Sequence, residues 1–184
     1  MAYRNGTYVA FHADGNNIPG KTDIDYYQLM RAWSAHPDDD FTMVNSHEKA
    51  WAVRDSSSRS TLRNSLLTRL RNSKNMVLII GETTRFDTDW VPFEIESAVD
   101  TYEIPIIVTY TSKVCNTPIR VPSALSSYWP VALTTRINNG TAHVIHMPFK
   151  KEPLMDTISQ FSHNNYPPYD FYSDAAYTAF GIPG

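Results

Sequence analysis

One glutamate, Glu94, stands out among the residues of this chain that could do chemistry. It follows the stretch Asp89-Trp90-Val91-Pro92, in which Asp89 is expected to cap a helix and Pro92 is tolerated in its first turn. Near a helix N-terminus, the helix dipole favours an ionised carboxylate by roughly 0.3–1 kcal/mol. A single ionised carboxylate can stabilise positive charge that develops in a transition state. The alternative is a surface acid that merely complements the dipole.

The neighbouring acid, Glu96, is the competitor of Glu94 on the same predicted helix. The two side chains should point about 200° apart, because they are two residues apart in a helix. We expect the buried stripe of this helix to consist of Val91, Ile95, Ala98 and Tyr102, with Glu94 outside it.

A second group of polar and aromatic residues lies in loops that follow predicted strands. We expect any one of them alone to be a solvated loop residue, whereas for the set together a binding site and a solvated surface both stay open. Arg54 could pair with a phosphate, and Trp90 could stack on a planar ring or close the core. The set comprises His12, Asp14, Asn45, His47, Glu48, Arg54, Asp55, Glu82, Arg85 and Trp90.

Alternating strands and helices must position these residues. Apolar or β-branched runs predict strands at 7–11, 41–44, 75–81, 104–110 and 142–147. Helical spacing predicts helices after Asp23, after Ser58, after Asp89 and over 152–161. The pattern weakens after residue 111. Tyr26, Leu29, Met30 and Trp33 give the first helix its expected apolar stripe.

This alternation predicts an α/β fold, namely a doubly wound, mostly parallel five-stranded sheet with helices on both faces. In such sheets, ligands bind beyond the carboxyl ends of the strands, where the loops named above begin. We expect one domain over residues 1–162. A tail over 163–184, rich in aromatic residues and proline, should dock on the body or on another subunit.

Composition excludes several classes of protein. The 184 residues are 42% hydrophobic and 19% charged, with a net charge of −3, which disfavours disorder and a broadly basic nucleic-acid surface. The one cysteine, Cys115, cannot form an internal disulfide or a thiolate metal site. No apolar run approaches the length of a signal peptide core or a membrane span. We therefore expect a soluble, cytoplasmic protein that contacts neither membrane nor nucleic acid.

Several familiar motifs are missing. No glycine-rich dinucleotide or P-loop signature follows a predicted strand, and no G-x-S-x-G elbow is present. His143 and His146 should lie on opposite faces of a strand, so we expect no metal site there. A receiver-type phospho-acceptor would need an aspartate after the strand 75–81, which ends instead in Gly81-Glu82.

Six phrases together resemble the TIR-like family typified by the TIR subunit of Thoeris antiphage systems. They span residues 7–110 in order, at plausible spacing, with WVPFEIESAV matching the W-x-x-x-E element of TIR domains. The others are YVAFHADGN, DIDYYQLMRAW, VNSHEKAWAVRDSSS, LLTRLRNSKNMVLIIGETT and PIIVTY. Residues 111–184 match only loosely, through AHVIHMPFK.

The resemblance implies a flavodoxin-like domain that binds NAD and breaks its nicotinamide–ribose bond. The family's catalytic glutamate maps onto Glu94. Its first-strand loop maps onto Phe11, His12 and Asp14, with His12 standing where many relatives carry an acid. The second-strand loop maps onto Asn45 and His47. The ADP-ribose product, rearranged or cyclised, would then activate an effector protein.

The residues agree with this chemistry, because nicotinamide leaves NAD as a neutral molecule and needs no general acid. Ordinary glycosidases, by contrast, need two carboxyl groups. We expect no cofactor beyond NAD as the substrate, and assembly into a homo-oligomer is left open. The alternative function is a non-catalytic TIR-like module that works by assembly, for which exposed aromatic residues of the tail would suit a partner surface.

Overall fold

The computed structural model of the chain describes residues 4–12, 23–39, 41–44 and 56–183. Five strands form one sheet in the order β2-β1-β3-β4-β5, and each neighbouring pair is parallel. The strands are β1 (Gly6–Ala10), β2 (Thr42–Val44), β3 (Ser73–Ile80), β4 (Ile106–Tyr110) and β5 (Val144–Pro148). The predicted flavodoxin-like α/β fold is therefore confirmed, and all of its strand pairs are parallel.

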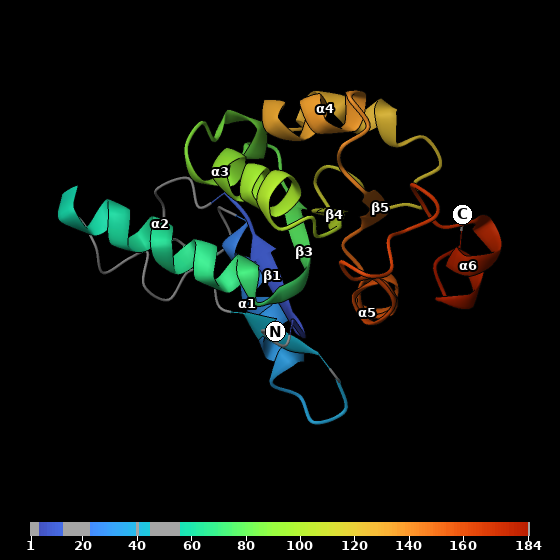
Figure 1. Ribbon diagram of the computed structural model, residues 1–184. Coiled ribbons are helices and arrows are strands. Elements are labelled where there is room, and N and C mark those ends of the chain that lie inside the picture. The colour runs from blue at the N-terminus through green and yellow to red at the C-terminus, as the bar shows by residue number, and fades with distance from the viewer. Residues whose placement is uncertain (1–3, 13–22, 40, 45–55, 184) are drawn as a thin grey trace.

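Helices cover both faces of this sheet (Figure 1). One face carries α2 (Ser56–Arg71), α3 (Trp90–Glu96) and α4 (Val131–Asn138). The other carries α1 (Ile24–Ser34), α5 (Lys151–Gln160) and α6 (Asp174–Ala179). Short 3-10 segments at Thr84–Phe86 and Pro122–Tyr128 complete the loops after β3 and β4, and a π-helical segment at Ser97–Thr101 extends α3.

The alternation of side chains along each strand divides the core into two clusters. Tyr8 and Ala10 of β1 point toward α2 and α3, whereas Val9 and Phe11 point toward α1 and α5. Strand β3 does the same over its whole length, because all but one of its residues are fully buried. This is the pattern of a central strand that is covered on both faces.

The first helix differs from its predicted stripe. Leu29 is 44% exposed, and the buried residues of α1 are Tyr27 and Met30. Tyr27 packs against Phe11, with ring centroids 4.8 Å apart. The helix is therefore rotated relative to the prediction, so that Tyr27 faces the sheet.

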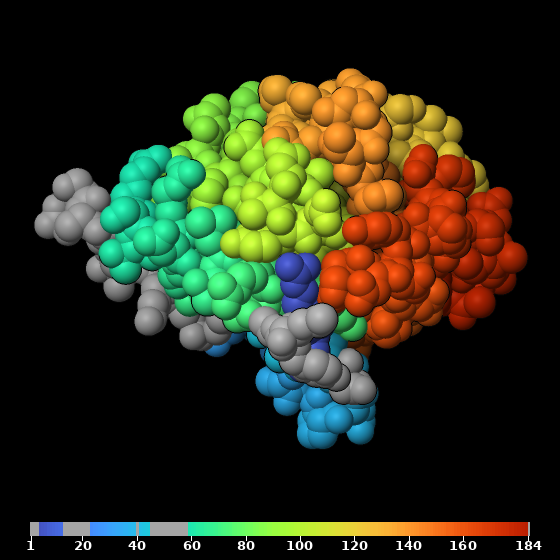
Figure 2. All heavy atoms as spheres, viewed as in Figure 1, coloured from blue at the N-terminus to red at the C-terminus, as the bar shows by residue number. Residues whose placement is uncertain are grey.

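The C-terminal segment packs against the rest of the chain (Figure 2). Tyr172, Tyr177 and Ile182 belong to the same buried cluster as α1 and α5. The backbone N–H of His146 in β5 donates to the carbonyl of Asp170 at 2.8 Å, so the segment lies along the edge of the sheet. The division at residue 162 stays a prediction.

Candidate active site

Glu94 lies one turn inside α3 and is 1% exposed. It shares the buried side of the helix with Val91 and Ile95, whereas Glu96 is exposed and lies 4.0 Å from Arg136. The prediction that the two side chains point in different directions is confirmed, but the expectation that Glu94 lies outside the buried stripe of the helix is wrong. The reason is that the Glu94 side chain bonds Tyr8 of β1, so the side of α3 that faces the sheet includes position 94.

Tyr8, in the middle of β1, holds the Glu94 side chain. Its hydroxyl donates a hydrogen bond to Glu94 Oε1 at 2.5 Å, and the tyrosine is fully buried. Sequence reasoning missed Tyr8, because a tyrosine within an aromatic and β-branched strand reads as a core residue. Its position within a buried strand could have pointed to it, because a tyrosine hydroxyl needs a hydrogen-bond partner when it is buried.

Burial raises the pKa of Glu94 to about 8, although the hydrogen bond from Tyr8 opposes this rise. The nearby Asp87 carboxylate raises the pKa further. The expectation of a carboxylate ionised by the helix dipole is therefore wrong for the protein without ligand. Desolvation of a fully buried carboxyl group outweighs a dipole contribution of roughly 0.3–1 kcal/mol.

The second carboxyl oxygen of Glu94, Oε2, is buried and has no hydrogen-bond partner among the described residues. Most buried polar atoms in folded proteins are hydrogen-bonded, and leaving one unpaired costs roughly 1–3 kcal/mol. An unpaired oxygen of this kind is free to accept a hydrogen bond from a ligand.

Asp87 organises the start of α3 and links it to β1. Its Oδ1 accepts hydrogen bonds from the backbone N–H groups of Asp89 and Trp90, at 2.8 and 3.0 Å. His12 Nδ1 donates to Asp87 Oδ2 at 3.0 Å. Burial alone would raise the pKa of Asp87, but these hydrogen bonds hold it below its usual value. Asp87 thus supplies the side-chain cap that was expected of Asp89, which pairs instead with Arg59.

A further carboxyl group, that of Asp23, lies at the carboxyl end of β3. Its Oδ2 accepts a hydrogen bond from Thr84 Oγ1 at 3.0 Å, and that hydroxyl in turn accepts one from the Gly81 N–H at 2.8 Å. A Cβ on Gly81 would lie 2.0 Å from Asp23 Oδ1, so only glycine permits this approach. Burial raises the pKa of Asp23 to about 6, against the influence of Thr84 and the His12 ring.

Three acids and one histidine are therefore gathered where β1 and β3 end, at the switch point of the sheet. The charge of Asp87 acts on Glu94, and His12 acts on both Asp87 and Asp23. From the sequence, Asp23 was identified only as the residue before a helix, a position where side-chain caps are common.

The structure describes three of the remaining predicted residues, namely Trp90, Glu82 and Phe11, and leaves four outside its described part. Trp90 is partly buried at the start of α3, with the Arg59 guanidinium 5.3 Å from its ring centre, and Glu82 is exposed directly after β3. Phe11 is 2% exposed and points to the face opposite Glu94. Asp14, Asn45, His47 and Arg54 lie outside the described residues, so their roles stay predictions.

Arg69, on the helix α2, also lies near this group of residues. Its Nη1 atom is buried without a hydrogen-bond partner among the described residues. The guanidinium lies close enough to Tyr8 to lower the pKa of that phenol, although burial and Glu94 raise it more strongly. Arg69 therefore places a positive charge near Tyr8, the hydrogen-bond partner of Glu94.

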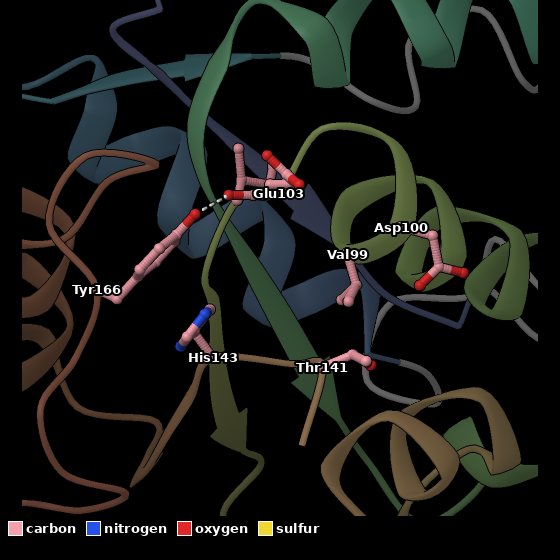
Figure 3. A pocket seen from close by; sticks show the side chains of 7 residues that line it. Val99, Asp100, Glu103, Thr141, His143 and Tyr166 are labelled. Atoms are coloured by element: carbon pink, nitrogen blue, oxygen red, sulfur yellow. Dashed lines mark hydrogen bonds between the residues drawn. The ribbon is translucent and has the colours of Figure 1, made fainter. Parts of the chain in front are cut away.

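A separate cavity of about 330 Å³ opens at the other end of the sheet, beside the amino ends of β4 and β5. Figure 3 shows Tyr166 beside His143, with the Tyr166 hydroxyl bonded to the Glu103 carbonyl at 2.9 Å. The two rings stack with centroids 3.9 Å apart. Ligands of doubly wound sheets bind at the opposite, carboxyl end, so this cavity is distinct from the Glu94 site.

The sheet order and the acids at its switch point define a flavodoxin-like domain of the doubly wound α/β class with a candidate ligand site at the carboxyl end. A family model described as "Thoeris protein ThsB, TIR-like domain" matches residues 8–115. Because this match covers more than half of the 184 residues, the chain belongs to that family. The matched region contains Tyr8, Asp23, Asp87 and Glu94. Within the described part of the chain, no helix combines the length and apolar character needed to cross a bilayer.

Proposed function

We propose that this protein cleaves the bond between nicotinamide and ribose in NAD, with Glu94 as the catalytic residue. The observation that carries the proposal is the buried Glu94 carboxyl group. Tyr8 holds one of its oxygens, and the other has no hydrogen-bond partner in the described part of the chain. This group follows β3, at the switch point where doubly wound sheets bind nucleotides. Membership of the ThsB TIR-like family supports the same substrate.

The reaction needs only one carboxylate. The C1′–N bond breaks, its electron pair moves to the pyridinium nitrogen, and nicotinamide leaves as a neutral molecule. The ribose carbon takes on oxocarbenium character, which the Glu94 carboxylate stabilises through space and through a hydrogen bond from a ribose hydroxyl to Oε2. A nucleophile then adds to C1′ and gives up its proton.

Substrate binding itself favours the ionised form of Glu94. The nicotinamide ring of NAD carries a positive charge, and a cation near a buried carboxyl group lowers its pKa. Glu94 would thus be largely protonated in the empty site and lose its proton as NAD enters. Tyr8 would hold the charged carboxylate in place, because its hydroxyl donates to Oε1.

The acceptor decides the product. Water would give ADP-ribose, an adenine nitrogen would give a cyclic ADP-ribose, and another nucleophile would give a conjugate. A site that excludes water favours cyclisation. In a Thoeris antiphage system, such a product would act as a diffusible signal that activates a partner effector during infection.

Two charge-removing variants of the same helix test the proposal. Glu94→Gln keeps the size of the side chain and should reduce nicotinamide release from NAD by about 100-fold or more. Glu96→Gln removes an exposed charge two residues away and should leave release unchanged. Free nicotinamide is measured by chromatography with mass detection, with and without lysate from infected cells. Undiminished turnover by Glu94→Gln would refute the assignment of Glu94, and wild-type protein inactive in both arms would instead support a non-catalytic assembly module.

A further inference from the structure

A cavity of about 590 Å³ is lined by residues of α5, of α6 and of the segment that joins them. Figure 1 shows α5 and α6 at the end of the sheet that β5 forms. Its volume falls within the range of roughly 300–1,000 Å³ that is typical of small-molecule sites. Every described lining residue lies between 156 and 180, outside the part of the chain that the family model matches. The Glu94 site and its chemistry therefore leave this cavity without a role.

Aromatic rings form the walls of the cavity. Tyr169, Phe171, Tyr172 and Phe180 all line it. The rings of Tyr172 and Phe180 stand at 79° to each other with centroids 5.1 Å apart, and those of Tyr169 and Tyr172 stand at 52° with centroids 5.8 Å apart. At these distances the rings touch one another edge to face or at a tilt, so they form one continuous aromatic wall.

A single carboxylate, that of Asp156, gives the lining its charge. No lysine or arginine is found among the described lining residues. Asp156 Oδ2 accepts hydrogen bonds from the Tyr172 hydroxyl and from Gln160 Nε2, both at 2.5 Å. Within the described residues, these bonds fix the carboxylate through one oxygen and leave Oδ1 without a hydrogen bond.

The carboxylate also makes the neighbouring rings better partners for a cation. A phenol that donates its proton toward a carboxylate gains electron density in its ring, and Tyr172 is in this position. The pKa of Tyr169 is raised by burial and by the charge of Asp156, which places that charge beside a second ring of the wall. Ring faces attract cations through the negative charge above the ring plane.

We propose that this cavity binds a small molecule that carries an organic cation, such as a quaternary ammonium group. An anion would meet the Asp156 carboxylate with no positive side chain among the described lining residues to offset it. A neutral apolar ligand would leave that carboxylate without a counter-charge. An aromatic wall beside one fixed carboxylate suits an alkylated ammonium group, which carries both a positive charge and an apolar surface.

A pair of probes with nearly the same shape tests the charge preference. Choline and its neutral carbon analogue, 3,3-dimethylbutan-1-ol, are titrated into the full chain, and binding is followed by NMR shifts and calorimetry. We expect choline to bind about tenfold more tightly than the neutral analogue. Equal affinities, or no saturable binding of choline, would overturn the proposal.

Matched variants of one wall residue locate the binding. Tyr169 is 40% exposed, so its replacement should leave the protein folded. Tyr169→Leu keeps apolar surface but loses the ring, and it should weaken choline binding several-fold, whereas Tyr169→Phe should retain it. Asp156→Asn keeps an acceptor for Tyr172 and should also weaken binding of choline but not of the neutral analogue. Phe86→Ala removes an exposed ring elsewhere and is the control. Choline binding that is unchanged in both Tyr169→Leu and Asp156→Asn would place the cation outside this cavity and refute the proposal.

Discussion

At the scale of single residues, the candidate site depends on the Glu94 carboxyl group. The fold buries this group, and burial disfavours its ionised form. Glu94 is 1% exposed and, within the described residues, is bonded to Tyr8 through one oxygen and unpaired through the other. Such a group destabilises the folded state when it ionises, and a ligand that is positively charged can offset this cost. Strain of this kind is typical of functional positions, where stability and activity oppose each other.

The stability of the protein should therefore depend on pH through Glu94. Because the pKa is about 8 in the folded state and about 4.5 in the unfolded state, the protonated form favours folding below pH 4.5. This contribution is lost as the pH rises toward 8, at up to about 1.4 kcal/mol per pH unit. Glu94→Gln should abolish this loss, so its melting temperature should increasingly exceed that of the wild type between pH 5 and 8. A constant difference across this range would contradict the buried, protonated state.

Tyr8→Phe should shift the pH dependence of the reaction. Removing the hydroxyl takes away a hydrogen bond that lowers the pKa of Glu94, so that pKa rises further above its present value of about 8. If ionised Glu94 is the active form, kcat/KM rises with pH toward that pKa, and its midpoint should move to higher pH in the variant. Activity at pH 7 should fall as a result.

Tyr110→Phe is the matched control for this measurement. The Tyr110 hydroxyl is also buried, but within the described residues its hydrogen bonds are with Trp129 and His146 and not with Glu94. Its loss should reduce stability and leave the midpoint of the pH profile unchanged. A shift of equal size in both variants would show that a general loss of stability, rather than the Tyr8–Glu94 bond, sets the midpoint.

At the scale of elements, the loop between β3 and α3 decides where Glu94 lies. Asp87 joins three parts of this region: the first N–H groups of α3, the imidazole of His12 and, through its charge, the Glu94 carboxyl group. The close approach of Asp23 to Gly81 fixes the start of the same loop. The geometry of the site thus depends on backbone groups as much as on side chains.

Asp87→Ala should destabilise the protein by about 1–3 kcal/mol, because the helix cap and the partner of His12 are both lost. Asp87→Asn keeps an oxygen for the cap and should recover part of this stability. Removing the charge should also lower the pKa of Glu94, since Asp87 raises it. Urea unfolding measures the first effect and the pH profile of nicotinamide release the second. Equal stability of the alanine variant and the wild type would show that the cap contributes nothing.

At the scale of the whole molecule, the C-terminal segment is part of the core. Tyr172 and Tyr177 are almost fully buried, and the backbone of residues 170 and 171 lies along β5. This segment lies beyond the region that the family model matches. The segment covers one edge of the sheet and lines a cavity of its own.

Truncation after residue 162 should therefore unfold the protein or cause it to aggregate. Each large apolar side chain that is removed from the core costs about 1.5–3 kcal/mol, and Tyr172, Tyr177 and Ile182 would all be lost. Loss of the segment would also expose the backbone of β5. Circular dichroism and thermal melting of residues 1–162 measure the effect, with truncation after residue 182 as the control. A soluble 1–162 fragment with an unchanged melting temperature would show that the segment is an appendage.

The sequence by itself determined the class of the fold, the order of strands and helices up to β4, the later elements β5 and α5, and the different directions of Glu94 and Glu96 on α3. These features depend on local periodicity and on the spacing of a motif, which are properties of the linear chain. Helices α4 and α6 were missed, because α4 is short and α6 depends on packing by its aromatic residues against α5 and β5.

Only the tertiary structure decided which groups surround Glu94 and in which state of charge. Tyr8 is 86 positions away in the sequence, and Asp23 meets Gly81 and Thr84 only because α1 folds back onto the end of β3. Burial, unlike periodicity, is a property of the assembled molecule. A local pattern predicted an ionised acid at a helix start, and desolvation by distant strands reversed that prediction.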